Sequence, residues 1–559
     1  MSVDLNQDLA KRFLNFLDTK QYKRLQFEAD MIGEIENQHP LIIFYYASAI
    51  YLQDSSTNEE LIYASSLFEK VYLLKKTAIQ PLQNMIVISF KTKQYKKVLN
   101  YALEAYETNK QNVILIEGLA RMNFYLGNRK ESLKLFKSLY EILPEKTEGR
   151  FPFISSLNYA SGISQEEYME ECLKYTKIIE KKLNIDNDKF EFIPNKNKKI
   201  KINFLSADFK KHSVSYFLKD LLNRLDKSIF EISLVSNLKV TQQDELSVEL
   251  KNIVDNWYDV EDLSTNELTK FLISLNIDIL IDLSGFTRGN RFEVLAKRCA
   301  KIQILWLGYN NSLGIKNLDY LISDKNLIKP NEFNLYKEKV LYLPKIWNSL
   351  SIPENLPEID KESKLNNSLF TFCSFNNFQK LSDQTIGVWS QILKNKKSNL
   401  LLKDSLRGGP DLKNNVIEKF RNNGVGEEQI IFLDHQESLS DHLRLYNKAN
   451  AALDTFPYPG VTTSCEAILM GLPVLTMKGF NFNSRCGESI NKTIDMEHMI
   501  ANDEKDYLEK AFLLMEDSDL VNKYGINLRK KALSSALFDT ETFAKDFQNL
   551  ILKVNKDYI

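Results

Sequence analysis

Two segments in the last third of the chain carry side chains suited to binding a diphosphate. In the first, the apolar run LFTFCSF leads into a polar turn that contains Asn377 and ends at Lys380. A lysine at the carboxyl end of a strand presents a compact positive charge, which suits a diphosphate. We therefore expect Asn377 and Lys380 to face a nucleotide.

The second segment places hydroxyl groups at the predicted start of a helix. Thr462 and Thr463 come directly after a Pro-Gly turn in PYPGVTTSCEAIL, which follows the apolar run AALDTF. Free backbone N–H groups and the helix dipole favour an anion there, and the hydroxyls add donors. Glu466, one turn later, is placed to accept hydrogen bonds from both ribose hydroxyls. A capping box, T/S-x-x-E, would account for the same residues without a ligand.

Two of the five histidines lie where an imidazole can act on a substrate. His212 follows the strand KINFLS in a turn before a helix, where a neutral ring can accept a proton or bond a phosphate or hydroxyl. His442 lies on a helix that precedes AALDTF and can reach a nucleotide base. A helix cap would explain His212 without a ligand, and a place on an amphipathic helix would explain His442.

A glycine-rich loop follows the strand IDILIDL. Gly285 and Gly289 permit close approach of the backbone, Thr287 offers a hydroxyl, and Arg288 and Arg291 offer positive charge. The loop suits a sugar or a phosphate, although glycine turns are also common where strands end. The next polar loop, YNNS, is expected to line the acceptor side of the site.

The elements that must position these residues alternate between short apolar strands and amphipathic helices. This βαβ pattern begins after Lys199 and predicts two parallel sheets. We expect a first Rossmann-like lobe over residues 198–345, a polar linker over 346–368, and a second lobe over 369–559 whose last helix can pack back on the first lobe. Ligands of such sheets bind outside the carboxyl ends of the strands, where the residues above lie.

The first third of the chain contains a helical repeat. Ala64, Val98 and Ser132 are spaced by 34 residues, and apolar or aromatic residues recur four and seven positions after each. This period resembles that of the tetratricopeptide repeat. We expect a helical solenoid over residues 1–195, ending in an amphipathic helix over 164–184 and a linker. Such a solenoid offers a concave surface to a protein substrate, unless it only supports the lobes that follow.

The overall composition argues against several classes of protein. The 73 basic and 74 acidic residues leave a net charge of -1, so no broad positive field is available to nucleic acid or a lipid surface. The five cysteines form no CxxC pair, which is typical of reduced thiols in the cytoplasm. No apolar run is long enough to cross a bilayer, and no signal peptide is recognisable. We expect a cytoplasmic chain that neither binds nucleic acid nor enters a membrane.

Taken together, the motifs resemble one family of enzymes. The catalytic region of the O-GlcNAc transferase and SPINDLY family is similar, in this order, to SADFKKHSVSYFL, IDILIDLSGFTRGN, WLGYNNSLG, SFNNFQKLSDQT, LDTFPYPGVTTSCEAILMGLPVLT and SRCGES. The resemblance covers about residues 201–501. It implies GT-B architecture and an inverting reaction, with a tetratricopeptide array as the usual companion. The expected fold class is therefore α + α/β, a helical solenoid followed by two Rossmann-like lobes.

The resemblance also implies roles for individual residues. His212 matches the active-site histidine, as a base or as a positioner of the acceptor hydroxyl. Lys380 matches the residue that neutralises the leaving nucleoside diphosphate, and Thr462 and Thr463 match its phosphate donors. Contacts to the donor sugar, the base and the ribose are matched, in that order, by Thr287, His442 and Glu466.

No metal or other cofactor is implied, because a lysine and a helix start would meet the charge that develops on the diphosphate. The one D-x-D near the catalytic region, Asp186 to Asp188, falls in the linker and is not interpreted as a metal site.

The donor is less closely specified. The resemblance implies a second histidine of the animal transferases at the position of Asp278. It implies basic residues beside the uridine at the positions of Leu439 and Leu445. This chain has neither. HSVSYF and DTFPYPGVTT are closer to the SPINDLY branch, plant members of which resemble protein O-fucosyltransferases that use GDP-fucose.

The sequence thus predicts transfer of a sugar, N-acetylglucosamine from UDP-GlcNAc, to Ser or Thr of an intracellular protein docked on the solenoid. GDP-fucose is the alternative donor. A dedicated transferase for one protein, such as flagellin or an adhesin, with Asn as a further acceptor, is a second alternative. An inactive tetratricopeptide scaffold is an alternative of another class, which the presence of both His212 and Lys380 opposes.

Overall fold

The computed structural model divides into two compact units. The first unit comprises Met1–Lys146 and Leu406–Val416, and the second comprises Thr147–Ser405 and Ile417–Ile559. The structure describes residues 3–146, 150–185, 192–193, 199–360, 369–395, 398–403, 409–517 and 524–557.

The first unit is helical, and its repeated positions form the packing face that the 34-residue period predicts. Ala64, Val98 and Ser132 lie on every second helix and are buried. Small side chains at these positions let neighbouring helices approach closely. None of the helices that the structure describes, in either unit, is long and apolar enough to cross a bilayer. The helices of the first unit are α1 (Val3–Asp18), α2 (Tyr22–Ile32), η1 (Ile35–Asn37), α3 (Pro40–Tyr51), α4 (Asn58–Leu74), α5 (Ile79–Thr92), α6 (Lys96–Thr108), α7 (Val113–Tyr125) and α8 (Arg129–Ile142).

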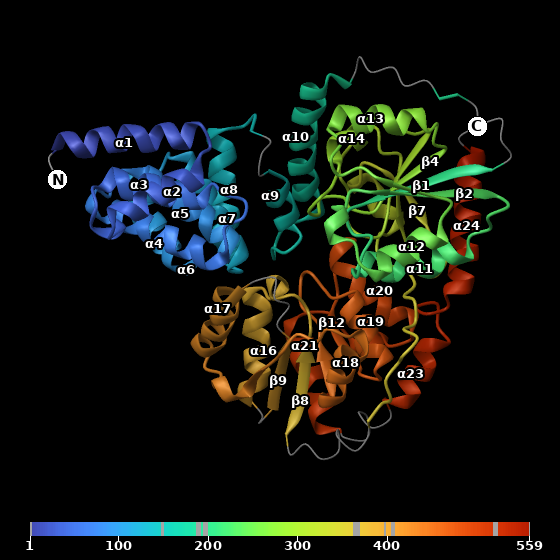
Figure 1. Ribbon diagram of the computed structural model, residues 1–559. Helices are drawn as coiled ribbons and strands as arrows, with labels where there is room; N and C mark the ends of the chain where they lie inside the picture. Colours follow the sequence, from blue (N-terminus) through green and yellow to red (C-terminus); the bar gives the residue numbers. More distant parts are fainter. Residues whose placement is uncertain are drawn as a thin grey trace. The chain divides into compact units, whose positions relative to one another are not determined.

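The second unit contains the two predicted parallel sheets (Figure 1). The first has the strand order β3-β2-β1-β4-β5-β6-β7, so the chain reverses its direction across the sheet between β1 and β4. Apolar runs form these strands because helices cover parallel sheets on both faces. The strands are β1 (Ile200–Ser206), β2 (Phe230–Ser236), β3 (Asn256–Asp259), β4 (Ile279–Asp282), β5 (Ile302–Leu305), β6 (Tyr320–Ser323) and β7 (Lys339–Tyr342).

The second sheet has the order β10-β9-β8-β11-β12-β13. Its reversal falls between β8 and β11, which pair in register through Phe372 and Ala451. Ligands bind at such reversal points, outside the carboxyl ends of the strands. The strands are β8 (Phe370–Ser374), β9 (Ser398–Lys403), β10 (Ile430–Leu433), β11 (Ala451–Leu453), β12 (Val474–Met477) and β13 (Ile500–Ala501).

The last helix packs on the first lobe, as the sequence predicts. Trp306, directly after β5, has its ring centroid 6.3 Å from that of Phe543 and 4.9 Å from that of Phe547, and Figure 1 shows α24 beside this lobe. Helix α17 (Gly409–Asn422) is divided between the two units at Val416. The other helices of the second unit are α9 (Arg150–Leu157), α10 (Gln165–Leu183), α11 (Ser213–Arg224), η3 (Val240–Gln242), α12 (Glu245–Ile253), α13 (Thr265–Ser274), α14 (Phe292–Ala296), η4 (Pro330–Leu335), η5 (Phe378–Lys380), α16 (Asp383–Asn395), η6 (Glu427–Gln429), α18 (Leu439–Arg444), η7 (Leu445–Lys448), α19 (Thr462–Leu469), η8 (Asn483–Arg485), α20 (Cys486–Thr493), η9 (Glu497–Met499), α21 (Glu504–Glu516), α23 (Ile526–Leu533) and α24 (Thr540–Asp557).

Helices α9 and α10 belong to the unit that holds the sheets, whereas the sequence places them at the end of the helical solenoid. The reason is polar: Tyr168 donates its hydroxyl to the carbonyl of Ser312 at 2.9 Å, and Thr176 donates to the carbonyl of Leu313 at 3.1 Å. The limits of α10 agree with the sequence, since Ser164 forms its N-terminal capping box and Asn184 is its C-cap.

The segment between the lobes begins inside the core. Trp347 is fully buried, accepts a hydrogen bond at its carbonyl from the indole of Trp306 at 2.9 Å, and donates its backbone N–H to Asp324 at 3.1 Å. The prolines and polar residues further along led us to expect a polar linker from residue 346 onward. Residues 361–368 of that segment, and the Asp186–Asp188 pair of the earlier linker, lie outside the described residues.

Candidate active site

Three neighbouring strands of the second sheet end at one edge and are followed there by polar side chains. Lys403 ends β9, Asn376 follows β8, and Asp454 follows β11. The amide of Asn376 donates to Asp454 at 3.1 Å, and its carbonyl oxygen accepts from the hydroxyl of Thr463 at 2.6 Å. Asn376, Asp454 and Thr463 line a small pocket together with Phe375. The loop after β8 is thereby tied to the start of α19.

Lys380 is the cation at this edge. Helix η5 ends on it, and its ammonium donates to the carbonyl of Pro459 at 2.8 Å, in the turn that leads to α19. Burial lowers the pKa of Lys380 to about 8, although the nearby charge of Asp454 opposes this shift. Since that pKa lies above neutrality, a positive charge is held beside the helix start at pH 7.

The start of α19 is not closed by a capping box. Its N-cap residue is Val461, and no side chain caps it. The hydroxyl of Thr463 instead bonds Asn376, and Glu466 bonds residues of other elements. A Cβ at Gly460 would lie 2.5 Å from the Thr463 hydroxyl oxygen, so the close approach of this turn needs glycine. Thr462 and Thr463 therefore open a helix whose end can receive an anion.

Glu466 ends a chain of hydrogen bonds that starts at Lys403. The ammonium of Lys403 lies 2.6 Å from Nδ1 of His442, and Nε2 of His442 lies 3.0 Å from Oε2 of Glu466. The hydroxyl of Tyr446 donates to the same carboxylate oxygen at 3.0 Å. Because an ammonium only donates, Nδ1 accepts, and the ring proton on Nε2 is given to Glu466. Both ring nitrogens of His442 are thus already engaged within the protein.

In the first lobe, His212 is the N-cap of α11. Its Nδ1 accepts from the backbone N–H of Val214 at 3.4 Å and lies 3.8 Å from a carboxylate oxygen of Asp208. The helix-cap explanation therefore holds for one ring nitrogen. With Nδ1 as the acceptor, the proton of the neutral ring lies on Nε2, which suits a hydrogen-bond donor better than a base.

The glycine loop after β4 is braced by its own polar groups. Thr287 donates its hydroxyl to the carbonyl of Ser284 at 2.8 Å. Arg291, expected to offer charge to a ligand, instead donates to Asn237 at 2.8 Å and to the carbonyl of Leu263 at 2.9 Å. Its guanidinium shapes the loop, because these contacts direct it into the protein.

The YNNS loop, which the sequence led us to expect on the acceptor side, bonds to the α9–α10 segment and, through the amide of Asn310, to Cys486 of α20. Tyr309 accepts from Asn158 at 2.9 Å, and Asn311 donates to the same residue at 2.9 Å. Ser312 donates to the buried carboxylate of Glu338 at 2.5 Å. These side chains are buried because they join a helical segment to the sheet.

Two further residues have local roles. Asn377 caps η5, its side-chain oxygen accepting from the N–H of Gln379 at 3.0 Å. Asp278 lies at the amino end of β4 and accepts from the N–H of Lys201 at 2.9 Å, so it braces the sheet edge opposite the site.

Sequence reasoning missed four residues of this site. Lys403 and Asp454 carry a signal, since each is a charged residue where an apolar run ends, in LLLKD and AALDTF. Asn376 directly precedes Asn377, which the sequence predicted to face a nucleotide. Tyr446 carries no local signal, because only the packing of η7 brings its hydroxyl to Glu466.

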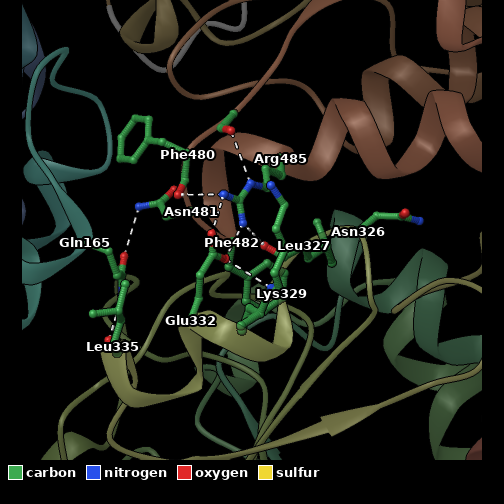
Figure 2. A network of polar contacts seen from close by, with 12 residues as sticks. Gln165, Asn326, Leu327, Lys329, Glu332, Leu335, Phe480, Asn481, Phe482 and Arg485 are labelled. Atoms are coloured by element: carbon green, nitrogen blue, oxygen red, sulfur yellow. Dashed lines mark hydrogen bonds and ion pairs between the residues drawn. The ribbon is translucent and has the colours of Figure 1, made fainter.

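A buried polar network joins the two lobes near the site (Figure 2). The guanidinium of Arg485, at the end of η8, forms a two-pronged ion pair with Glu332 of η4 at 2.5 and 2.8 Å. Gln165 of α10 accepts from Asn481 of the second lobe at 3.1 Å. Paired and hydrogen-bonded in this way, the charges hold one arrangement of the lobes.

Comparisons with known proteins identify a family of glycosyltransferases. The family model described as glycosyl transferase family 41 matches residues 156–350 and 353–547. A probable UDP-N-acetylglucosamine–peptide N-acetylglucosaminyltransferase SPINDLY of Solanum lycopersicum is 27% identical over 367 residues, which are 64% of this chain and 39% of that protein. The SEC transferase of Arabidopsis thaliana is 26% identical over 64% of this chain and 37% of its own length. The chain thus spans less than half the length of these relatives.

A solved structure, a mutant O-GlcNAc transferase of Thermobaculum terrenum, matches 93% of this chain and 99% of its own with a TM-score of 0.78 and 21% identity. This likeness confirms the fold, a helical region followed by the two lobes of the GT-B architecture. The matched family spans both lobes and reaches back into α9. The chain therefore belongs to glycosyl transferase family 41, a family of sugar-transferring enzymes.

Proposed function

We propose that the chain moves a sugar from a nucleotide donor to a Ser or Thr hydroxyl of an intracellular protein, with inversion and without a metal. One observation carries the proposal. The ammonium of Lys380 is fixed at 2.8 Å on the carbonyl of Pro459, one residue before the turn glycine that opens the uncapped helix α19. A lysine charge and a helix start there can meet the charge of a leaving diphosphate.

The remaining residues take parts that fit this step. Glu466, held by His442 and Tyr446, accepts the ribose hydroxyls. The Nε2 proton of His212 positions the acceptor or the donor phosphate. Thr287 contacts the sugar from the glycine loop. Transfer breaks the bond between the anomeric carbon and the diphosphate oxygen, forms a bond to the acceptor oxygen, and releases the acceptor proton.

We propose UDP-GlcNAc as the donor and a protein docked on the helical repeats as the acceptor, in agreement with the names of the curated relatives. Leu439 and Leu445, one on each side of His442 along α18 and η7, stand where the resemblance implies basic residues beside a uridine, which keeps GDP-fucose as the second candidate. Mass spectrometry of a protein mixture incubated with either donor decides between them. A hexosamine on Ser or Thr supports the first donor, a deoxyhexose supports the second, and sugar on Asn of one protein supports a dedicated transferase.

Replacing Lys380 by Ala tests whether its charge at the start of α19 assists the leaving diphosphate. We expect kcat/KM to fall by about 10²- to 10³-fold, because one preorganised charge at the leaving group is lost. The matched control is Lys505→Ala, at a lysine whose side chain is 87% exposed in the same lobe. Equal kinetics for the Lys380→Ala enzyme and the wild type would contradict the role of Lys380. Absence of any transfer by the wild type would favour the inactive scaffold.

A further inference from the structure

The ammonium of Lys380 contacts Tyr458, whose ring stacks on Tyr159, a residue of the segment that precedes both lobes. Its ammonium lies 4.3 Å from the ring centroid of Tyr458, within the range of a cation–π contact. Tyr458 in turn stacks on Tyr159, with ring centroids 4.5 Å apart and planes inclined by 28°. Tyr159 follows α9, two residues beyond its end. One ring therefore links the active-site lysine to the α9–α10 segment.

The backbone next to Tyr159 is fixed by buried bonds to both lobes. The preceding Asn158 donates to the hydroxyl of Tyr309 at 2.9 Å and accepts from Asn311 at 2.9 Å, both in the first lobe. Its carbonyl accepts from Asn483 of the second lobe at 3.4 Å. Because Asn158 is buried and bonded on three sides, Tyr159 has little freedom to leave its partner.

Helix α10 anchors the same corner a few residues later. Gln165 donates to Asn311 at 2.8 Å and accepts from Asn481 at 3.1 Å, the second contact being drawn in Figure 2. Tyr159 thus lies on a short connection between two anchored points. Its position depends on the closed pair of lobes as a whole, not on α9 alone.

The charge of Lys380 depends mainly on how far its ammonium is shielded from water. Asp454, after β11, is the neighbouring carboxylate, and burial raises its pKa to about 6. Cys486 of α20 and Tyr458 are also close, and burial raises the pKa of both, so these two groups are neutral at pH 7. Burial is also the main cause that lowers the pKa of Lys380. Admission of water beside the ammonium would raise that pKa toward its ordinary value.

We propose that Tyr159 is a positioning residue for Lys380. It holds the ring of Tyr458 against the ammonium and keeps water from this side of the site, so the α9–α10 segment completes a site that the two lobes form only in part. The proposal rests on the proposed function for the use of the charge, since Lys380 is there to meet a diphosphate.

The test compares Tyr159→Ala and Tyr159→Leu, which remove the stacked ring, with Tyr159→Phe, which keeps it. The full-length proteins are acetylated with a trace of acetic anhydride at a series of pH values, and mass spectrometry follows the reactivity of Lys380. We expect a midpoint near pH 8 for the wild type, retained by the Phe variant, and a higher midpoint for the Ala and Leu variants, because burial is the largest cause of the low pKa and its relief outweighs the loss of the cation–π contact. The alkaline limb of kcat/KM should move in the same direction.

Melting temperatures identify any variant that fails to fold, and Leu retains enough bulk to limit that loss. A folded Ala or Leu variant whose Lys380 midpoint equals that of the wild type would overturn the role of Tyr159. The acetylation needs no nucleotide, so it judges this inference separately from the proposed function. That function fails instead if UDP and GDP both leave the wild type without a measurable shift in melting temperature.

Discussion

At the scale of single residues, the roles follow from which polar atoms already have partners. His442 illustrates this: the motif predicts contact with a base, but Lys403 and Glu466 occupy its two ring nitrogens. The chain of bonds fixes one tautomer and one direction of the Glu466 carboxylate. Under the proposed function, this chain of bonds would place the Glu466 carboxylate as a hydrogen-bond acceptor for the ribose.

Lys403→Met tests this chain, because methionine keeps much of the side-chain length but cannot donate. We expect the Kd for the nucleoside diphosphate to rise by about 10- to 150-fold, in line with the roughly 1.5–3 kcal/mol of one hydrogen bond to a charged group, with little change in kcat. Isothermal titration calorimetry measures the Kd. The exposed Lys505→Met variant serves as the control. A Lys403→Met enzyme that binds as tightly as the wild type would show that the chain does not support Glu466.

At the scale of elements, a carboxyl group with a raised pKa lies at the carboxyl end of a strand. Asp282 ends β4, is fully buried, and accepts from the N–H of Gly285 at 2.7 Å. Its other oxygen has no hydrogen-bond partner among the described residues. Burial raises the pKa of Asp282 to about 7. The strand end therefore holds a carboxyl that resists ionisation.

This raised pKa sets the sign of a pH effect on stability. As pH rises from about 4 to about 7, the unfolded chain gives up this proton before the folded chain does, so the free energy of unfolding falls. Asp282→Asn cannot ionise, and we expect its free energy of unfolding to fall less between pH 5 and pH 8, by about 2 kcal/mol. Urea unfolding at both pH values measures this, with Asp434→Asn, at an exposed position, as the control. Parallel falls in the wild type and the Asp282→Asn variant would contradict it.

Helix limits were predictable where their signals are local. Ser164 and Asn184 mark the two ends of α10 in the sequence and in the structure, since caps act within one turn. The capping box at Thr463 and Glu466 was an equally local explanation, yet both side chains bond to other elements. Trp347 is a further case, because its burial depends on Trp306 and Asp324, which lie far away in the chain.

At the scale of the whole molecule, the two lobes are locked by charge as well as by apolar contact. The side chain of Arg485 is only 5% exposed, and its guanidinium bonds the carbonyls of Leu327 and Phe480 in addition to Glu332. Figure 2 shows these bonds converging on one side chain. Breaking such a pair leaves a buried charge without its partner.

Arg485→Met is therefore expected to lower the free energy of unfolding of the second unit by about 3–5 kcal/mol and to reduce transfer activity, because Glu332, whose side chain is only 17% exposed, keeps its charge without this partner. Calorimetry and the transfer assay measure the two effects. The exposed ion pair of Lys505 and Glu509 provides the comparison, since Lys505→Met should cost less than about 1 kcal/mol. A cost as small for Arg485 would mean that the ion pair does not lock the lobes.

The sequence by itself determined the elements and the loops that carry chemistry. Apolar runs, glycine turns and a 34-residue period are local patterns, so they indicate two parallel sheets, a helical repeat, and polar groups such as Lys380 at strand ends. Only the tertiary structure decided which of these groups meet. The side chains of Lys403, His442 and Glu466 meet although they lie on different elements. Tyr159 is linked to Lys380 through Tyr458, which lies about 300 residues after Tyr159 in the chain. Such contacts depend on strand order and on the packing of α9 and α10, which no local pattern encodes.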